Sequence, residues 1–202
     1  MKYIIMAAGK GTRWNNYLDV PKHLIEINGE TLLARTTRLL KENGIKDYII
    51  TSSDERYKQY GTTIPQTRND AEIDRFEYVN DNEICYLYGD VYYTDEAIKT
   101  IINTKAQDVL FFGSHVEIFA VKIIDKDMFF SHKKKVKELY MQGRINRCIG
   151  WEVYRSIHKI PFNQHIITNR YVYIEDGTDD IDYPEDYIEF KKKYEKEWFY
   201  AI

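Results

Sequence analysis

Short apolar runs separated by polar turns recur along the chain and predict a series of β-strands. Each run is rich in β-branched and aromatic residues and ends at glycine or at charged side chains. The expected strands are residues 3–6, 47–51, 84–88, 109–112, 117–124 and 166–175. The run 84–88, ICYLY, is apolar throughout, which is typical of a central strand buried on both faces of a sheet.

Apolar residues at helical spacing fill the stretches between these runs. The expected helices are residues 31–41, 55–60, 95–104, 127–141, 147–156 and 184–198. A further helical face is expected within 69–82, from the spacing of Ile73, Phe76 and Val79. Strands that alternate with helices predict an α/β fold with a mostly parallel sheet and right-handed crossovers. No repeat or linker interrupts the pattern, so residues 1–202 are expected to form a single domain.

Composition narrows the classes of protein that fit this pattern. The chain has 202 residues, of which 44% are hydrophobic, and this is ample for one core. Its formal net charge of −3 gives no electrostatic basis for binding nucleic acid. Cys85 and Cys148 lie far apart among apolar neighbours, as expected for reduced thiols in a cytoplasmic protein. No apolar run approaches the ~18 residues of a membrane span, so no membrane partner is expected.

The first expected strand breaks into a glycine loop that suits an anionic ligand. Gly9 and Gly11 allow a sharp turn and leave backbone N–H groups uncovered. Arg13 adds a forked cation suited to a polyphosphate, and Lys22, directly after Pro21, adds a point charge. The loop lacks the third glycine of a dinucleotide fingerprint. It also lacks the lysine that directly follows the last glycine of a Walker loop.

The segment AAGKGTR, followed by PKHLIEINGETLLART, resembles the signature of the sugar-phosphate nucleotidyltransferase superfamily. The family pattern is a strand, A-A-G-x-G-[TS]-R, a loop, P-K-x-L and a glycine turn before the first helix. This resemblance implies a three-layer α/β/α fold that is Rossmann-like and of the nucleotide-diphospho-sugar transferase type. It also implies catalytic roles for Lys22 and Arg13. The residues that it implies for nucleotide binding are Ala7, Ala8, Gly9, Gly11, Thr12 and Arg13.

A carboxylate directly follows the expected central strand. Asp90 would lie at the carboxyl edge of the sheet, where open α/β folds bind their ligands. There it would either ligate Mg²⁺, which takes one or two protein oxygens, or cap a turn, and the position alone leaves both roles open. The segment LYGDVYY is similar to the strand that ends in a metal-binding aspartate in the family. This resemblance implies that Asp90 is a metal ligand.

A second acidic segment precedes the last expected helix. Alternation along an extended chain puts Asp180 and Asp182 on one side, so either can face a metal held by Asp90. Acids also occur at helix N-termini, where the helix dipole favours them. The segment DIDYPEDY is similar to the D-I-D-T-P-E-D of several nucleotidyltransferases, which implies that Asp182 is the second metal ligand. Tyr183 stands where the family has threonine, and the choice between the two aspartates stays open.

These features predict an enzyme that transfers NMP from a Mg²⁺–NTP complex to a small phosphomonoester and releases pyrophosphate. The acceptor phosphate is already anionic at neutral pH, so catalysis rests on alignment and charge neutralisation, without a general base. The compact length resembles small cytidylyltransferases that activate phosphocholine- or phosphoglutamine-like head groups for bacterial capsule or surface polysaccharide. We therefore expect CTP as the nucleotide donor.

Alternatives to this function stay open. A sugar-1-phosphate uridylyl- or thymidylyltransferase usually has a longer chain and a G-T-A motif before the metal aspartate. A non-catalytic nucleotide-binding regulatory domain would have lost Lys22, Asp90 or the closing aspartates, and the sequence keeps all of them. The sequence also leaves open whether the protein forms a homodimer. The residues expected to line the acceptor pocket are Glu117, Arg147 and Trp151.

Overall fold

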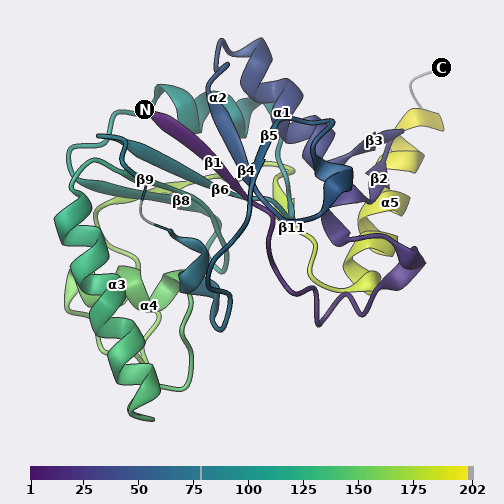
Figure 1. Ribbon diagram of the computed structural model, residues 1–202. Helices are drawn as coiled ribbons and strands as arrows, with labels where there is room; N and C mark the ends of the chain where they lie inside the picture. The colour runs from purple at the N-terminus through teal and green to yellow at the C-terminus, as the bar shows by residue number, and fades with distance from the viewer. Residues whose placement is uncertain (78, 200–202) are drawn as a thin grey trace.

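A seven-stranded sheet forms the centre of the computed structural model, which describes residues 1–77 and 79–199 (Figure 1). The strands are β1 (Lys2–Met6), β4 (Tyr48–Thr51), β5 (Thr62–Ile64), β6 (Ile84–Tyr88), β8 (Val109–Gly113), β9 (Ile118–Ile123) and β10 (Tyr171–Tyr173). Their order across the sheet is β10-β8-β9-β6-β1-β4-β5. Neighbours run parallel except at β9, which is antiparallel to β6 and β8. The prediction of a mostly parallel sheet is confirmed.

Helices cover both faces of this sheet, because successive side chains of a strand point to opposite sides. The covering helices are α1 (Leu32–Glu42), α2 (Asp95–Asn103), α3 (Lys126–Met141) and α4 (Gly150–His158). Ile5 of β1 packs in a buried cluster with residues of α1 and α2. Its neighbour Ile4 packs in a second cluster with residues of α3 and α4. The expected three-layer α/β/α arrangement is therefore confirmed (Figure 1).

Short strands and the last helix form a smaller unit beside the sheet. Its elements are the hairpin of β2 (Glu26–Ile27) and β3 (Glu30–Thr31), the pair of β7 (Val91–Tyr92) and β11 (Asp179–Asp180), and α5 (Pro184–Phe199). Trp14, Ile27, Ile181 and Tyr187 are buried together in this unit. In Figure 1, α5 lies beside β2 and β3. The acidic segment near the C-terminus thus returns to the N-terminal part of the chain.

Local sequence signals explain where the first helices begin and end. Thr31 and Thr94 cap α1 and α2, because their hydroxyl oxygens accept hydrogen bonds from the backbone N–H groups of Ala34 and Ala97. Gly44 follows α1 with a φ of +81°, the left-handed conformation that glycine adopts most easily. These ends fix where the chain leaves α1 to enter β4 and where it enters α2 after β7.

The prediction of a helical face within residues 69–82 is wrong. Among the residues of this stretch that the structure describes, the regular element is a 3₁₀ turn at Glu72–Arg75. Asp74 shapes the turn, because its Oδ2 accepts hydrogen bonds from the backbone N–H groups of Asp70 and Ala71 at 3.0 and 2.8 Å. Ile73 and Phe76 are fully buried and Val79 is partly buried, so the apolar spacing marked residues that face the core without forming an α-helix.

Smaller differences concern the extent of other elements. The strand expected over 166–175 is confined to β10, because Arg170 has a φ of +58° and interrupts the extended chain. The helix expected over 55–60 is a 3₁₀ turn at Glu55–Tyr57. The helix expected over 147–156 begins later, at Gly150, so the residues before it lie in a loop.

Two expectations from composition can be compared with the structure. Cys85 and Cys148 are both buried and free, as expected for reduced thiols. No helix within residues 1–77 and 79–199 has the length and apolar character needed to cross a bilayer.

Candidate functional site

The carboxyl ends of β1 and β6 meet where the strand order reverses. β4 continues the sheet on one side of β1, and β6 returns on the other side. Open α/β folds bind ligands in the crevice at such a switch point. Gly89 allows a close approach here, since its N–H donates to the carbonyl oxygen of Met6 at 3.0 Å and a Cβ would lie 2.7 Å from that oxygen. Asp90 is thereby held beside the loop that follows β1.

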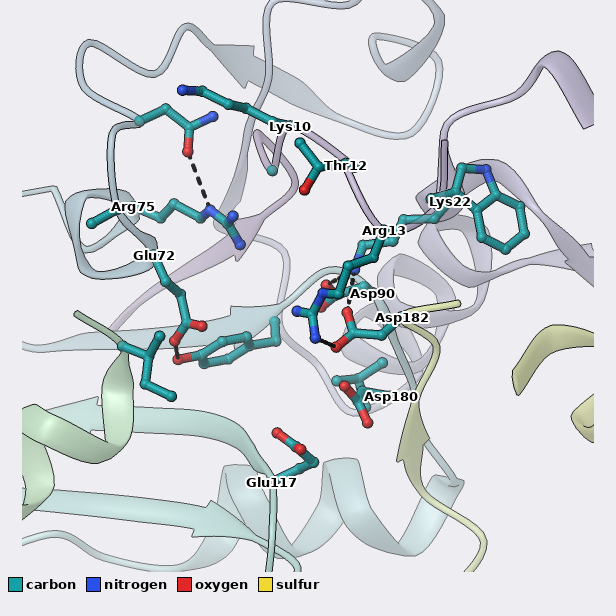
Figure 2. A pocket seen from close by; sticks show the side chains of 18 of the residues that line it. Lys10, Thr12, Arg13, Lys22, Glu72, Arg75, Asp90, Glu117, Asp180 and Asp182 are labelled. Atoms are coloured by element: carbon teal, nitrogen blue, oxygen red, sulfur yellow. Dashed lines mark hydrogen bonds and ion pairs between the residues drawn. The ribbon is translucent and has the colours of Figure 1, made fainter. Parts of the chain in front are cut away.

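A cavity of about 420 Å³ opens at this edge of the sheet (Figure 2). Both ends of the chain contribute to its walls. Of the residues predicted from the sequence, those that line it are Gly9, Gly11, Thr12, Arg13, Lys22, Asp90, Glu117, Trp151, Asp180 and Asp182. Ala7 and Ala8 line an adjoining cavity of about 410 Å³ that shares the glycine loop.

Lys22 stands at the centre of this site. It lies in a 3₁₀ turn at Lys22–Leu24, is 7% exposed, and its Nζ is 2.8 Å from Oδ1 of Asp182 and in direct contact with Oδ2 of Asp90. Burial opposes the charge of the ammonium group, but the two carboxylates outweigh it, so the pKa of Lys22 lies above its ordinary value. Burial likewise opposes ionisation of Asp90, yet Lys22 lowers the pKa of that carboxyl to about 2. Both groups are therefore charged at neutral pH.

Arg13 extends the charged cluster toward solvent. Its Nη1 contacts Oδ2 of Asp182, while about half of its side chain is exposed. The guanidinium carbon also lies 5.6 Å from the ring centroid of Tyr183, the residue that replaces the family's threonine. A tyrosine at this position thus adds a cation–π contact that supports the arginine.

Carboxylates outnumber the cations that neutralise them on one side of the cavity. Burial, followed by repulsion from Glu117 and Asp182, raises the pKa of Asp180 to about 8. Burial, followed by repulsion from Asp182, raises the pKa of Glu117 to about 7. Such raised values mark a place where a bound cation would be stabilising, because the carboxylates repel one another without one.

The predicted metal residues suit a hard divalent cation. Asp90, Asp180 and Asp182 all line the cavity, and carboxylate oxygens are the ligands that Mg²⁺ prefers. In the described part of the chain, no three His, Cys, Asp or Glu side chains are arranged to hold a metal ion, and Lys22 stands between Asp90 and Asp182. Mg²⁺ fills most of its shell with water and phosphate oxygens, so one or two of these carboxylates are enough. The residues fit the ion, and their role as ligands stays a prediction.

The glycine loop presents only part of its backbone to a ligand. Gly11 has a φ of +59°, which turns the loop at the point where its oxygen accepts from the N–H of Asn15 at 3.0 Å. The N–H of Ala7 donates to Oγ1 of Thr51 at 3.2 Å. The carbonyl oxygen of Ala8 accepts from Nδ2 of Asn69. These contacts fix the start of the loop, so an anion cradle is expected at Gly9 and beyond and not at Ala7.

Sequence reasoning missed part of the cavity wall. Glu72 accepts hydrogen bonds at Oε1 from the hydroxyl of Tyr88, at 2.8 Å, and from the N–H of Gly150, at 2.9 Å. Glu72 thereby joins its own 3₁₀ turn, Glu72–Arg75, to β6 and to the start of α4. Asn69 and Arg75 also line the cavity. All of them precede β6 in a segment where the apolar spacing predicted only a helical face and gave no sign of a functional position.

Two of the three residues expected at the acceptor pocket line the cavity. Glu117 and Trp151 do so, and the indole N–H of Trp151 donates to the carbonyl oxygen of Val116 at 2.7 Å. Arg147 does not line it. Its Nη2 instead lies 3.3 Å from Oε1 of the buried Glu152, because α4 begins only after Arg147. The geometry therefore gives Arg147 no direct part in the site.

Comparison with known proteins bears on the identity of this site. Residues 3–75 match the family model of the MobA-like NTP transferase domain. This match covers the glycine loop, Lys22 and the 3₁₀ turn at Glu72–Arg75. The resemblance to sugar-phosphate nucleotidyltransferases is confirmed. A bifunctional IPC transferase and DIPP synthase from Thermococcus kodakarensis is 40% identical over 70 residues, which are 35% of this chain and 16% of that protein.

Solved nucleotidyltransferase structures resemble the chain over nearly its whole length. UDP-glucose pyrophosphorylase superposes with a TM-score of 0.68 at 13% identity, covering 97% of this chain and 98% of that one. The inositol-1-phosphate CTP transferase of T. maritima superposes with a TM-score of 0.59 at 14% identity, covering 96% of this chain and 95% of that one. The CTP:phosphocholine cytidylyltransferase of Streptococcus pneumoniae superposes with a TM-score of 0.56 at 17% identity, covering 95% of this chain and 98% of that one. The expected nucleotide-diphospho-sugar transferase-like fold is confirmed.

Proposed function

We propose that this protein transfers a nucleotidyl group from a Mg²⁺–NTP complex to a small phosphomonoester and releases pyrophosphate. The observation that carries the proposal is the position of Lys22, buried between Asp90 and Asp182 in a cavity walled by the glycine loop. A buried ammonium group that lines a cavity of about 420 Å³ is suited to charge that develops at a reacting phosphate.

The roles of the residues follow from their places in the cavity. The glycine loop and Arg13 would hold the outer phosphates, since bare amides and a guanidinium are good partners for phosphate oxygens. Lys22 would neutralise charge at the α-phosphorus. Asp90 and Asp182, with Asp180 beside them, would hold Mg²⁺, which when bound neutralises triphosphate charge.

The reaction balances without a general base. An oxygen of the acceptor phosphate forms a bond to the α-phosphorus, and the bond from that phosphorus to the oxygen of the β-phosphate breaks. The electron pair leaves with pyrophosphate, and the nucleotidyl group stays on the acceptor as a phosphoanhydride. Such an in-line displacement depends on alignment and on electrostatic stabilisation, which a preorganised cavity can supply.

For the donor and acceptor we propose CTP and a phosphocholine-like compound. A hollow of about 580 Å³ adjoins the site, and acids outnumber cations among the residues that line it. They are Arg13, Glu117, Asp179, Asp180, Asp182, Tyr183, Asp186, Glu189, Phe190 and Lys193. Acidic and aromatic side chains together suit a cationic head group. Two of the structures of similar fold are named as CTP-using enzymes, which supports the choice of nucleotide. The product would be an activated head group for surface or capsule polysaccharide, with a phosphoglutamine-like acceptor as the alternative.

A pyrophosphate-release assay with purified protein tests this function. Each of the four NTPs is combined with Mg²⁺ and with phosphocholine, phosphoglutamine, inositol-1-phosphate or glucose-1-phosphate. We expect the highest rate with CTP and phosphocholine. A tenfold or greater preference for UTP or dTTP with glucose-1-phosphate would favour a sugar-1-phosphate nucleotidyltransferase. Tight NTP binding without any turnover would favour a regulatory nucleotide-binding domain.

A further inference from the structure

Arg75 presents a guanidinium group to the cavity without a carboxylate partner among the described residues. Figure 2 shows its side chain extending from the side of the cavity toward the middle. The hydrogen bond described for its side chain is a long one, 3.4 Å from Nε to Oδ1 of Asn69. Arg13 and Lys22, by contrast, both contact Asp182. Arg75 therefore differs from the other buried or half-buried cations of the site.

Structural arginines elsewhere in this chain are paired. Arg170 makes a bidentate contact with Asp108, at 2.8 and 2.6 Å. Arg38 makes one with Glu30, with both distances at 2.8 Å. Among the described residues, Arg75 has no carboxylate oxygen at ion-pair distance, and its charge acts on Glu72 and Asp90 from farther away. A half-buried guanidinium without a direct partner recovers less of its lost hydration energy than a paired one does, which disfavours a purely structural role. The terminal nitrogens of Arg75 are available to an anion that enters the cavity.

The turn that carries Arg75 holds it rigidly. Ile73 and Phe76, on either side of it, are fully buried. Asp74, next to it, accepts at Oδ2 from Nζ of Lys137 at 2.7 Å and from the N–H of Ala71 at 2.8 Å. The backbone of Arg75 is thus fixed before any ligand binds. Because the backbone is already ordered, a ligand that binds the side chain does not have to order the backbone as well.

The guanidinium also lies against the glycine loop. A Cβ added at Gly9 would be 3.3 Å from both Cζ and Nη1 of Arg75. Asn69 joins the two elements, because its Nδ2 donates to the carbonyl oxygen of Ala8 while its Oδ1 accepts from Arg75. The guanidinium and the backbone of the glycine loop therefore border the same cavity. This combination is suited to a phosphate group.

We propose that Arg75 is a phosphate-binding residue of this cavity. The proposal rests on the proposed function only in taking the phosphate to be that of a substrate, either the NTP or the phosphorylated acceptor. The shared chemistry is an oxyanion held by the Arg75 guanidinium beside Gly9. Sequence reasoning did not find this residue, because it lies outside every motif of the chain.

Calorimetry with magnesium pyrophosphate and with inorganic phosphate tests the proposal on the full chain. Arg75→Gln is expected to weaken binding of at least one of these anions about 10- to 100-fold, the loss typical of a charged hydrogen-bond pair. Arg75→Lys should restore part of the affinity. Arg144→Gln, which removes an equal charge from an exposed loop residue, is the matched control and should bind as the wild type does. Unchanged affinity in Arg75→Gln, or no measurable binding by the wild type, would overturn the proposal.

Substrate kinetics then identify the source of the phosphate. A rise in KM for the NTP in Arg75→Gln, with KM for the acceptor unchanged, assigns the contact to the triphosphate. A rise in KM for the acceptor, with KM for the NTP unchanged, assigns the contact to the acceptor phosphate. If the wild type binds pyrophosphate through Arg75 but transfers no nucleotidyl group, the proposed function fails and this inference stands. If turnover is normal and Arg75→Gln changes neither KM nor anion binding, this inference fails alone.

Discussion

At the scale of single residues, Lys22 acts as an internal counter-ion for two carboxylates that come from different parts of the chain. Its contact with Asp90 keeps that buried acid ionised, and its Nζ also contacts Asp182, whose side chain is 15% exposed. A buried ion pair is weak evidence for stability, but removal of one partner leaves an uncompensated buried charge. The residue is therefore expected to matter to stability and to catalysis in ways that can be measured separately.

Lys22→Met tests the catalytic role, because it keeps the buried stem and removes the charge. We expect kcat to fall about 10²–10³-fold, the loss typical for a preorganised charge at a developing anion, with a smaller change in KM for the NTP. Lys46→Met, at an exposed position, serves as the control. A raised KM with unchanged kcat would show that Lys22 binds the nucleotide and does not stabilise the transition state.

Asp90→Asn tests the metal site. The amide keeps the shape of the side chain but lacks the charge, so affinity for Mg²⁺–NTP is expected to fall at least about tenfold. Calorimetry with and without EDTA measures the affinity for the NTP. Chelation of Mg²⁺ should lower the affinity of the wild type, just as the substitution does. Asp127→Asn, an exposed position in the first turn of α3, is the control. Full Mg²⁺–NTP affinity in Asp90→Asn would remove Asp90 from the metal site.

His23 makes the fold sensitive to acid. The ring is 3% exposed, its Nδ1 lies 2.9 Å from the hydroxyl of Tyr57, and burial lowers its pKa to about 4. Because the folded-state pKa is below that of the unfolded chain, protonation favours unfolding. The stabilising contribution is complete above pH ~6.5 and declines as the pH falls toward 4. From pH 7.5 to 5 this group should lower the free energy of unfolding by about 2 kcal/mol.

Urea unfolding at pH 7.5 and pH 5 measures this contribution as a difference between wild type and His23→Asn. The comparison is needed because Asp180 and Glu117, with pKa values of about 8 and about 7, act in the opposite direction. Their raised values mean that acid favours the folded state through them. The variant should show less loss on acidification than the wild type does. An equal pH dependence in both proteins would contradict the role given to His23.

At the scale of elements, the contact between the ends of β1 and β6 positions Asp90. Gly89→Ala would place a Cβ 2.7 Å from the Met6 carbonyl oxygen, so one strand end must move. Overpacking of this kind typically costs about 1–3 kcal/mol, and here it also displaces the neighbouring carboxylate. We expect lower stability together with a loss of activity. Thermal unfolding and the pyrophosphate-release assay measure the two effects.

Gly143→Ala provides a control that separates stability from activity. Gly143 follows α3 with a φ of +68° and has open space around its Cα, so alanine adds backbone strain but no clash. Its loop lies outside the cavity walls. This variant should be less stable than the wild type but as active when folded. Retained activity in Gly89→Ala would show that the close approach of β1 and β6 does not position the site.

Elements of strong periodicity could be predicted from the sequence, and irregular ones could not. The runs that became β1 and β6 have uniform apolar character, and the site residues that directly follow them were found for that reason. Arg75 and Glu72 lie in a 3₁₀ turn, where side-chain contacts and not periodicity decide the geometry. Arg147 was expected at the acceptor pocket from where the later segments of such folds lie, but its guanidinium contacts Glu152 instead. Tertiary packing decides a contact of this kind, and no local sequence pattern signals it.

At the scale of the whole molecule, the site depends on pairing between segments that are distant in sequence. The sequence resemblance associated Asp182 with Asp90 as a second metal ligand, but it contained no information on how the two segments meet. The structure provides this through the pairing of β11 with β7, where Asp180 lies opposite Val91. The N–H of Ile181 also donates to the carbonyl oxygen of Asp90 at 3.0 Å. Such pairings arise from tertiary packing and are invisible to local sequence patterns.

The contact between Lys22 and Asp182 spans 160 residues of chain, which has a consequence for the order of folding. Closing so long a loop loses chain entropy before any contact compensates for it, and non-local pairings of this kind form slowly. During refolding, β1 and α1 can form while the site still lacks one of its carboxylates. We therefore expect NTP binding to return only after β11 has docked on β7, later than the first appearance of helix, and stopped-flow refolding with the two probes measures the difference.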